Sequence, residues 1–333
     1  MRLVNVLALT NAKLINDPFV SNFTNLVFEA KAVKRGDLFI AFDEENIEDA
    51  IANGAYGVIF DKPTQISDNE IAWIKVANIK EALKKLLRFK LIEKEILNYS
   101  CDEITLKFAL QINSEPKLLI INKSLRKIAQ SLWNIEKNSI TLFSKKFQDI
   151  DIFTDINSLT QSDTQYIQVL EKTLFETSFI YEKKYYDREF ISPLFISKIN
   201  DLINLYKKLH IDFRLRKFSA IENFEPIFIN KKLEIKEFGS TDRVLIFEKD
   251  LEFISQEIEF LKKNSAWAKT IYILPSSYHN IDEENDNVYR YKKSKEILQI
   301  LQKNNFNFAL IVGADRSIIS KPISIQTQLT LNF

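Results

Sequence analysis

Glycine is scarce in this chain. Its 333 residues include only five glycines, and none lies between Gly57 and Gly239. A loop that wraps backbone amides around a phosphate depends on glycine, because a side chain blocks the close approach and the unusual backbone angles. The sequence therefore excludes, from the middle of the chain, the glycine-rich phosphate loop that ends in Gly-Lys-Ser or Gly-Lys-Thr at a helix start.

Cysteine and histidine are also scarce, and long apolar runs are missing. Cys101 is the single thiol and there are two histidines, too few for an internal disulfide or a structural zinc site. No run of eighteen apolar residues is long enough to span a membrane, and the N-terminus lacks the cleavage site of a signal peptide. We expect a cytoplasmic protein with no metal, no cofactor and no membrane span.

The charges nearly cancel. Forty-six basic residues face 45 acidic ones, which leaves a formal charge of +1 and no global field that would attract nucleic acid. The hydrophobic fraction is 46%, with 26 phenylalanines, so the chain can bury a large core. A chain of this length favours two or three domains over one, and no nucleic-acid partner is expected.

Residues 28–60 hold three of the five glycines and alternate between strand and helix patterns. Two short apolar runs, 38–41 and 58–60, predict strands. Between them, apolar residues recur at helical spacing from residue 47 to 51, after an acidic start that suits a helix N-terminus. Gly54 suits the position just past the end of that helix. The stretch predicts a strand, a helix and a second strand.

This stretch resembles the N-terminal domain of the Mur ligases, in particular the enzymes that add the third residue or the terminal dipeptide to the cell-wall precursor. The residues that carry the resemblance are Gly36-Asp37-Leu38-Phe39-Ile40-Ala41 and Gly54-Ala55. The family precedes the first motif with Asp-Ser-Arg, where this chain has Glu29-Ala30-Lys31, and follows it with an Asp-Gly-His turn that is missing here. The resemblance implies the family's fold, while the ligand-binding residues differ.

The rest of the chain continues to alternate between strands and helices, which predicts parallel sheets of doubly wound type. Strands are expected at residues 71–76, 118–121, 140–143, 150–153, 227–229, 243–247, 270–274 and 308–312, and helices at 79–91, 125–133, 192–210, 251–262 and 291–304. The resemblance implies a three-domain α/β architecture. Its domains would be N-terminal (1–92), shortened central without a phosphate loop (93–226) and Rossmann-like C-terminal (227–333).

Six polar residues are candidates for substrate binding. They are Glu29, Lys31, Lys34, Arg35, Asp315 and Arg316. The resemblance places the first four where the family contacts a uridine diphosphate sugar, and an exposed turn is the alternative interpretation. The last two follow a strongly apolar strand, at the edge where open α/β sheets bind ligands; a plain turn is the alternative there.

The resemblance implies a reaction whose chemical groups are missing here. A Mur ligase activates a carboxylate with the γ-phosphoryl group of ATP, which requires a phosphate loop and carboxylates that hold magnesium. The family's Asp-x-Ala-His-Asn-Pro segment falls at Phe247-Glu248-Lys249-Asp250, without histidine or proline, and its Asp-Asn-Pro-Arg motif has no counterpart. We therefore expect no catalytic residues.

The sequence favours a catalytically inactive Mur-ligase homologue with a binding or regulatory role in peptidoglycan precursor metabolism. Its expected partner is a cell-wall ligase or a UDP-muramoyl-peptide precursor. Two alternatives stay open. One is a divergent precursor ligase with a rebuilt nucleotide site, and the other is a structural protein-interaction module whose clefts are filled by its own apolar side chains.

Overall fold

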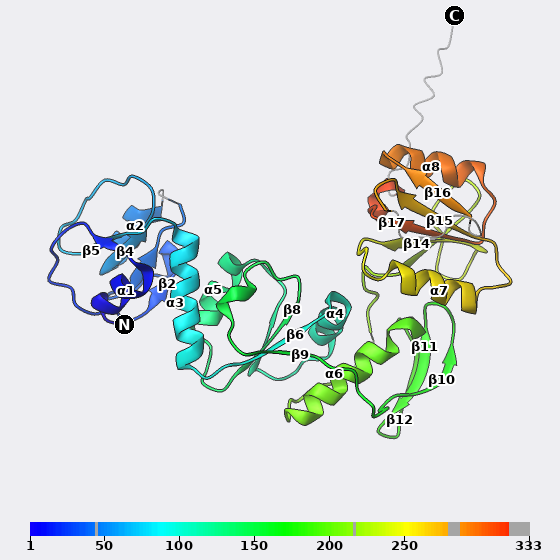
Figure 1. The fold of residues 1–333 in the computed structure, drawn as a ribbon, viewed down its shortest axis with the longest axis horizontal. Helices are drawn as coiled ribbons and strands as arrows, with labels where there is room; N and C mark the ends of the chain where they lie inside the picture. The colour runs from blue at the N-terminus through cyan, green and yellow to red at the C-terminus, as the bar shows by residue number, and fades with distance from the viewer. Residues whose placement is uncertain (44–45, 216–217, 279–286, 320–333) are drawn as a thin grey trace, which may run out of the picture. The chain divides into compact units, whose positions relative to one another are not determined.

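The computed structural model describes residues 1–43, 46–215, 218–278 and 287–319, which form two compact units (Figure 1). Unit 1 comprises Met1–Thr160 and Leu209–Phe213, and unit 2 comprises Gln161–Lys208 and Arg214–Phe333. The chain therefore passes from one unit to the other three times. In the described ranges, no helix combines the length and the apolar character needed to cross a membrane.

The first sheet of unit 1 has the order β1-β5-β4-β3-β2, in which β1 is antiparallel and the other strands are parallel. Its strands are β1 Lys13–Leu14, β2 Leu26–Val27, β3 Leu38–Ile40, β4 Gly57–Phe60 and β5 Ala72–Lys75, and its helices are α1 Leu3–Thr10, η1 Ala30–Ala32, α2 Ile47–Ala52 and α3 Ile79–Glu93. Successive side chains of a strand point to opposite faces, so both faces of this apolar sheet are covered. Leu38 and Ile40 join the core with α1 and α3, whereas Phe39 joins the core with α2.

The second sheet of unit 1 is entirely parallel, in the order β7-β8-β6-β9. Its elements are β6 Leu97–Cys101, α4 Glu103–Ile112, β7 Leu118–Ile121, α5 Leu125–Trp133, β8 Ile140–Ser144, η3 Ile150–Ile152 and β9 Ile156–Ser158. One apolar core runs from the first sheet through α3 and α5 to Phe143 of β8. This continuous core fixes α5 against the loops of the first sheet.

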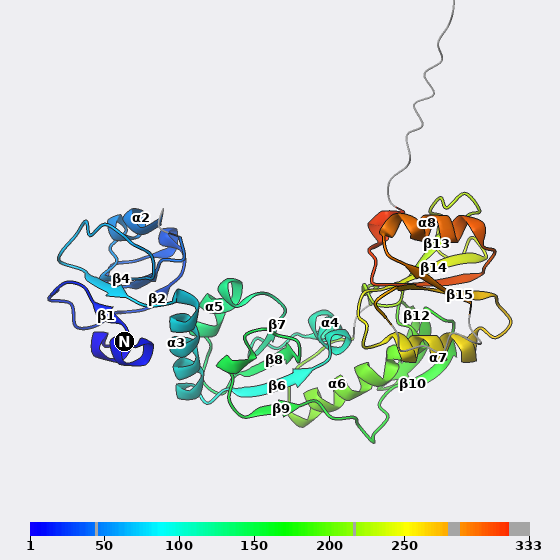
Figure 2. The ribbon, with the colours of Figure 1, turned by 45° about the horizontal axis from the view of Figure 1, so that its top comes forward.

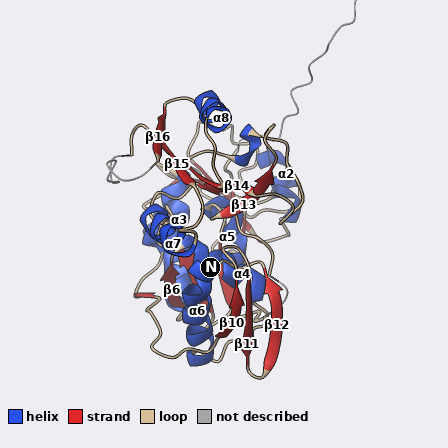
Figure 3. Ribbon diagram, turned by 90° about the vertical axis from the view of Figure 1, so that its right-hand side faces the viewer, coloured by secondary structure: helices blue, strands red, loops and turns tan. Residues whose placement is uncertain are grey.

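Unit 2 contains an antiparallel three-stranded sheet and a five-stranded sheet. The former has β10 Gln168–Lys172, β11 Thr177–Tyr181 and β12 Lys184–Glu189, drawn side by side in Figure 3, followed by η4 Pro193–Phe195 and α6 Ile196–Lys208. The latter has the order β13-β14-β17-β15-β16, with β13 antiparallel. Its elements are β13 Glu225–Ile229, β14 Arg243–Glu248, α7 Ile254–Asn264, β15 Thr270–Pro275, β16 Val288–Tyr291, α8 Ser294–Lys303, β17 Phe308–Val312 and η5 Arg316–Ile318. Figure 2 shows α7 and α8 on opposite faces of this doubly wound sheet.

Most predicted elements are confirmed, and one is wrong. Residues 150–153 form a 3-10 turn instead of a strand, because Ile152 is buried in the core with α3 and Phe153 stacks on Phe143 with ring centroids 4.3 Å apart. The helix expected from residue 291 begins at Ser294, since Tyr291 ends strand β16. Strand β6, helix α4 and the sheet β10–β12 were not expected. The domain boundaries after residues 92 and 226 stay predictions.

Replacing Gly54 with alanine is expected to destabilise unit 1 by roughly 2–3 kcal/mol. Gly54 has φ +98°, and an added Cβ would lie 3.0 Å from the Cα of Arg35, which is backbone and cannot rotate away. Gly239→Ala is the matched control, because Gly239 also has a positive φ but has no atom within 4 Å of its added Cβ. Scanning calorimetry should show the larger loss for Gly54→Ala, and equal losses would contradict the steric explanation.

Candidate functional site

A pocket of about 1140 Å³ opens in unit 1 between helix α5 and the segment that connects β2 to β3. We call it the anion pocket. It is lined by Thr24, Asn25, Val27, Phe28, Glu29, Lys31, Ala32, Val33, Lys34, Arg35, Asp37, Phe42, Arg126, Lys127, Gln130 and Asn134. Its size is in the range of pockets that bind small molecules and cofactors.

The backbone of the β2–β3 segment is held in place by hydrogen bonds. Residues 30–32 form the turn η1, and the side-chain amide of Asn53 donates a hydrogen bond of 3.0 Å to the Ala30 carbonyl. The buried carboxyl group of Asp37 accepts a 2.9 Å hydrogen bond from the backbone amide of Lys34. These bonds fix the backbone, so the exposed side chains of Lys31 and Lys34 extend from a rigid turn.

Helix α5 forms the facing wall. The indole of Trp133 donates a 2.8 Å hydrogen bond to Asn25, and the Gln130 amide donates to the Leu26 carbonyl. Arg126 forms an ion pair with Asp43, and its guanidinium lies 4.8 Å from the centroid of the Phe42 ring. The helix is therefore attached to the first sheet on both sides of the pocket.

The charges of the anion pocket are unbalanced. Five of its lining residues are cations and two are carboxylates. Arg126 pairs with Asp43, and the carboxylate of Asp37 is buried and accepts the hydrogen bond from the Lys34 amide. Among the described residues, no carboxylate lies within 4.0 Å of the ammonium groups of Lys31, Lys34 or Lys127. Free lysines that converge on one cavity are suited to bind a polyanion such as a diphosphate.

The four predicted residues of the first unit, Glu29, Lys31, Lys34 and Arg35, all line this pocket. The sequence did not identify the contributions of α5. Arg126, Gln130 and Asn134 recur at a spacing of four residues, which places them on one polar helix face. That spacing was a usable signal, but nothing in the sequence indicated which turn the face would meet.

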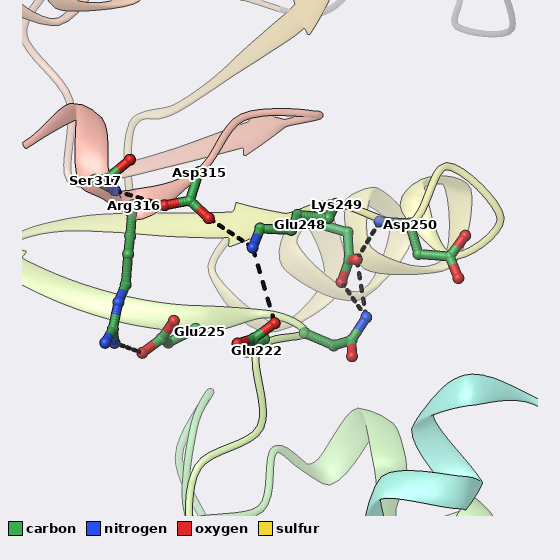
Figure 4. Close-up of polar contacts among 9 residues, drawn as sticks. Glu222, Glu225, Glu248, Lys249, Asp250, Asp315, Arg316 and Ser317 are labelled. Atoms are coloured by element: carbon green, nitrogen blue, oxygen red, sulfur yellow. Dashed lines mark hydrogen bonds and ion pairs between the residues drawn. The ribbon is translucent and has the colours of Figure 1, made fainter. Parts of the chain in front are cut away.

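The other two predicted residues, Asp315 and Arg316, lie in unit 2 at the carboxyl ends of β14 and β17 (Figure 4). Asp315 forms a 2.6 Å ion pair with Lys249, and Arg316 forms a 2.7 Å ion pair with Glu225. The hydrogen bond from the Lys249 ammonium, with those from Ser317, holds the pKa of Asp315 below its usual range. Both side chains are thus engaged by protein groups of opposite charge.

A buried pair of carboxyl groups lies beside these ion pairs. Glu248, at the end of β14, accepts hydrogen bonds from the Asn223 amide at 2.9 Å and from the Asp250 backbone at 2.6 Å (Figure 4). Glu257 of α7 is fully buried, and no hydrogen-bond donor of any described residue reaches its two oxygens. Burial, and then the charge of Glu248, raise the pKa of Glu257 well above its ordinary value. Glu257 therefore keeps its proton to a higher pH than an ordinary glutamate does.

In unit 1, strand β6 of the second sheet leads directly into helix α4. The strand ends at Cys101 and the helix begins at Glu103, so Asp102 alone separates them. The Asp102 carboxyl group accepts hydrogen bonds from the backbone amide of Thr105 at 3.0 Å and from its hydroxyl at 2.9 Å. The Asp102 carboxylate thus caps the N-terminus of α4.

Comparisons with known proteins were made by sequence and by structure. No protein-family model and no curated protein matches the chain. A crystal structure of MurF from Acinetobacter baumannii has a TM-score of 0.52 at 9% identity, covering 95% of this chain and 96% of that one. MurF ligase from Thermotoga maritima in complex with ADP has a TM-score of 0.47 at 11% identity, covering 88% and 94%. The similarity to the Acinetobacter baumannii structure shows that the chain has the α/β fold of the Mur ligases.

Proposed function

We propose that this protein is a catalytically inactive Mur-ligase homologue that binds a UDP-muramoyl-peptide precursor through the anion pocket. The single observation that carries the proposal is the convergence of Lys31, Lys34 and Lys127, without partner carboxylates among the described residues, on a cavity of about 1140 Å³. The phosphate groups of a uridine diphosphate sugar would form ion pairs with these lysines. Binding alone would suit a regulatory role toward the precursor or toward a ligase that uses it.

The β6–α4 junction supports the inactive part of the proposal. A phosphate loop needs several residues between strand and helix, with backbone amides turned toward the phosphates. Here a single residue, Asp102, joins the two elements, and its carboxyl group already binds Thr105. A negative side chain at this position repels a nucleotide phosphate, and the chain has no glycine between residues 57 and 239 to rebuild the loop.

Calorimetry with a UDP-muramoyl tripeptide and with Mg-ATP tests both parts. We expect the muramoyl peptide to bind with an affinity that falls as salt rises, since the contacts are ionic. We expect no heat from Mg-ATP and no phosphate release when both are present. Phosphate release that depends on the peptide would overturn the proposal in favour of a divergent ligase. Absence of any binding would favour the structural interaction module.

A further inference from the structure

A second cavity, of about 470 Å³, lies within unit 2, where the β10–β11 turn meets the amino ends of β14 and β17. It lies at the opposite edge of the five-stranded sheet from Asp315 and Arg316. We call it the aromatic pocket, and its defining side chains are Phe175, Phe228, Phe238, Trp267 and Phe308. Nothing in the proposed function uses it.

The four phenylalanines of this pocket pack on one another from three segments of the chain. The Phe175 ring lies 6.4 Å from Phe228 and 6.3 Å from Phe308, measured between centroids, and both pairs are edge to face. Phe238 lies 4.8 Å from Phe228. The rings therefore form a preformed apolar wall, because each is held by at least one neighbour.

Trp267 stands at the mouth of the pocket and is 78% exposed. Its indole and the Phe308 ring meet edge to face, with ring centroids 6.1 Å apart. The other two tryptophans, Trp73 and Trp133, are buried. An exposed indole beside an apolar cavity is a typical stacking surface for a planar ligand.

The pocket is lined by two cations, Lys172 and Arg188, and by two carboxylates, Glu176 and Asp242. Arg188 pairs with the buried Glu176 at 2.8 Å. Asp242 lines the pocket just before β14, and Lys172 lines it from the end of β10. Among the described residues, no carboxylate lies within 4.0 Å of the Lys172 ammonium. Lys172 is therefore available to an acidic ligand.

We infer that the aromatic pocket binds a small aromatic acid, with its ring against Trp267 and Phe308 and its acidic group on Lys172. A planar ring gains stacking that a saturated ring of the same size cannot, and a carboxylate gains a charge-assisted bond to the ammonium. The volume of the pocket is sufficient for one ring with a short side chain.

Ligand-observed NMR titration with three small probes tests the ligand chemistry. Phenylacetate carries both features, cyclohexylacetate lacks the aromatic ring, and phenethylamine carries the opposite charge. We expect phenylacetate to bind about tenfold more tightly than either of the others. Equal affinities for phenylacetate and cyclohexylacetate would overturn the inference. Tighter binding of Gly-Gly-Phe, which presents the same groups on a peptide, would reassign the pocket to a peptide terminus.

Three substitutions test whether phenylacetate binds in the aromatic pocket. Trp267→Ala and Lys172→Gln should each weaken phenylacetate binding about tenfold, and Phe238→Leu should weaken it less. Lys231→Gln, an exposed lysine outside the pocket, should leave it unchanged. Trp267 and Lys172 are at the surface, so thermal melts should match the wild type. Unchanged phenylacetate binding in both Trp267→Ala and Lys172→Gln would show that the ligand binds elsewhere. None of these variants should alter muramoyl-peptide binding, which makes the two proposals separable.

Discussion

Charge reversal of Lys31 and Lys127 together is expected to weaken the binding of a UDP-muramoyl peptide by at least about a hundredfold. The two lysines line the anion pocket from two elements, the turn η1 and helix α5, and the proposed function places the diphosphate against both. Each charge-assisted contact typically contributes about 1.5–3 kcal/mol, and reversal adds repulsion to the loss. Calorimetry on the double variant Lys31→Glu, Lys127→Glu measures the effect.

The matched control for this prediction is the double variant Lys13→Glu, Lys85→Glu. Both lysines are exposed in unit 1 and neither lines the pocket, so the net charge of the protein changes equally. At moderate ionic strength, charges more than about 10 Å from the ligand are screened. An equal loss of affinity in the two variants would mean that the overall charge attracts the ligand and that the pocket does not recognise it.

We expect the second large effect at the buried carboxyl pair of unit 2. Substitution of one member should raise the free energy of unfolding, and substitution of the other should lower it. Glu257→Gln should stabilise the protein at neutral pH by about 1–2 kcal/mol, because a neutral amide can donate to Glu248 without first being protonated. Glu248→Gln should destabilise it by about 3 kcal/mol, because the new side-chain NH2 group would face the N–H groups of Asn223 and Asp250, which are also donors. Urea unfolding of the two isosteric variants compares them directly.

The pH dependence of the same pair follows from the raised pKa of Glu257. The unfolded carboxyl group loses its proton near its ordinary value of 4.5, whereas the folded group keeps it to a higher pH. Between these two values the native state binds the extra proton, so the free energy of unfolding falls as pH rises. Between about pH 5 and about pH 8, the free energy of unfolding should fall less in Glu257→Gln than in the wild type. A fall of the same size would mean that Glu257 is ionised in the fold.

Local pattern was enough to predict much of the scaffold. Apolar runs and turn glycines correctly predicted β3, α2 and β4 around Gly54, and helical spacing correctly predicted α5 at Leu125–Trp133. These elements are determined by residues that are neighbours in sequence or one helix turn apart. The same reasoning failed at residues 150–153, where burial against α3 and Phe143 favoured a 3-10 turn over a strand.

The sequence by itself determined the fold class, the lack of a glycine-rich loop between Gly57 and Gly239, and the four candidate residues of the β2–β3 turn. Only the tertiary structure decided what those residues face. Lys31 and Lys127 are far apart in the chain, and the core shared by α3 and α5 brings them to one cavity. Likewise, the sequence did not indicate that Asp315 pairs with Lys249 or that Arg316 pairs with Glu225. Such pairings depend on contacts between distant segments, which no local pattern encodes.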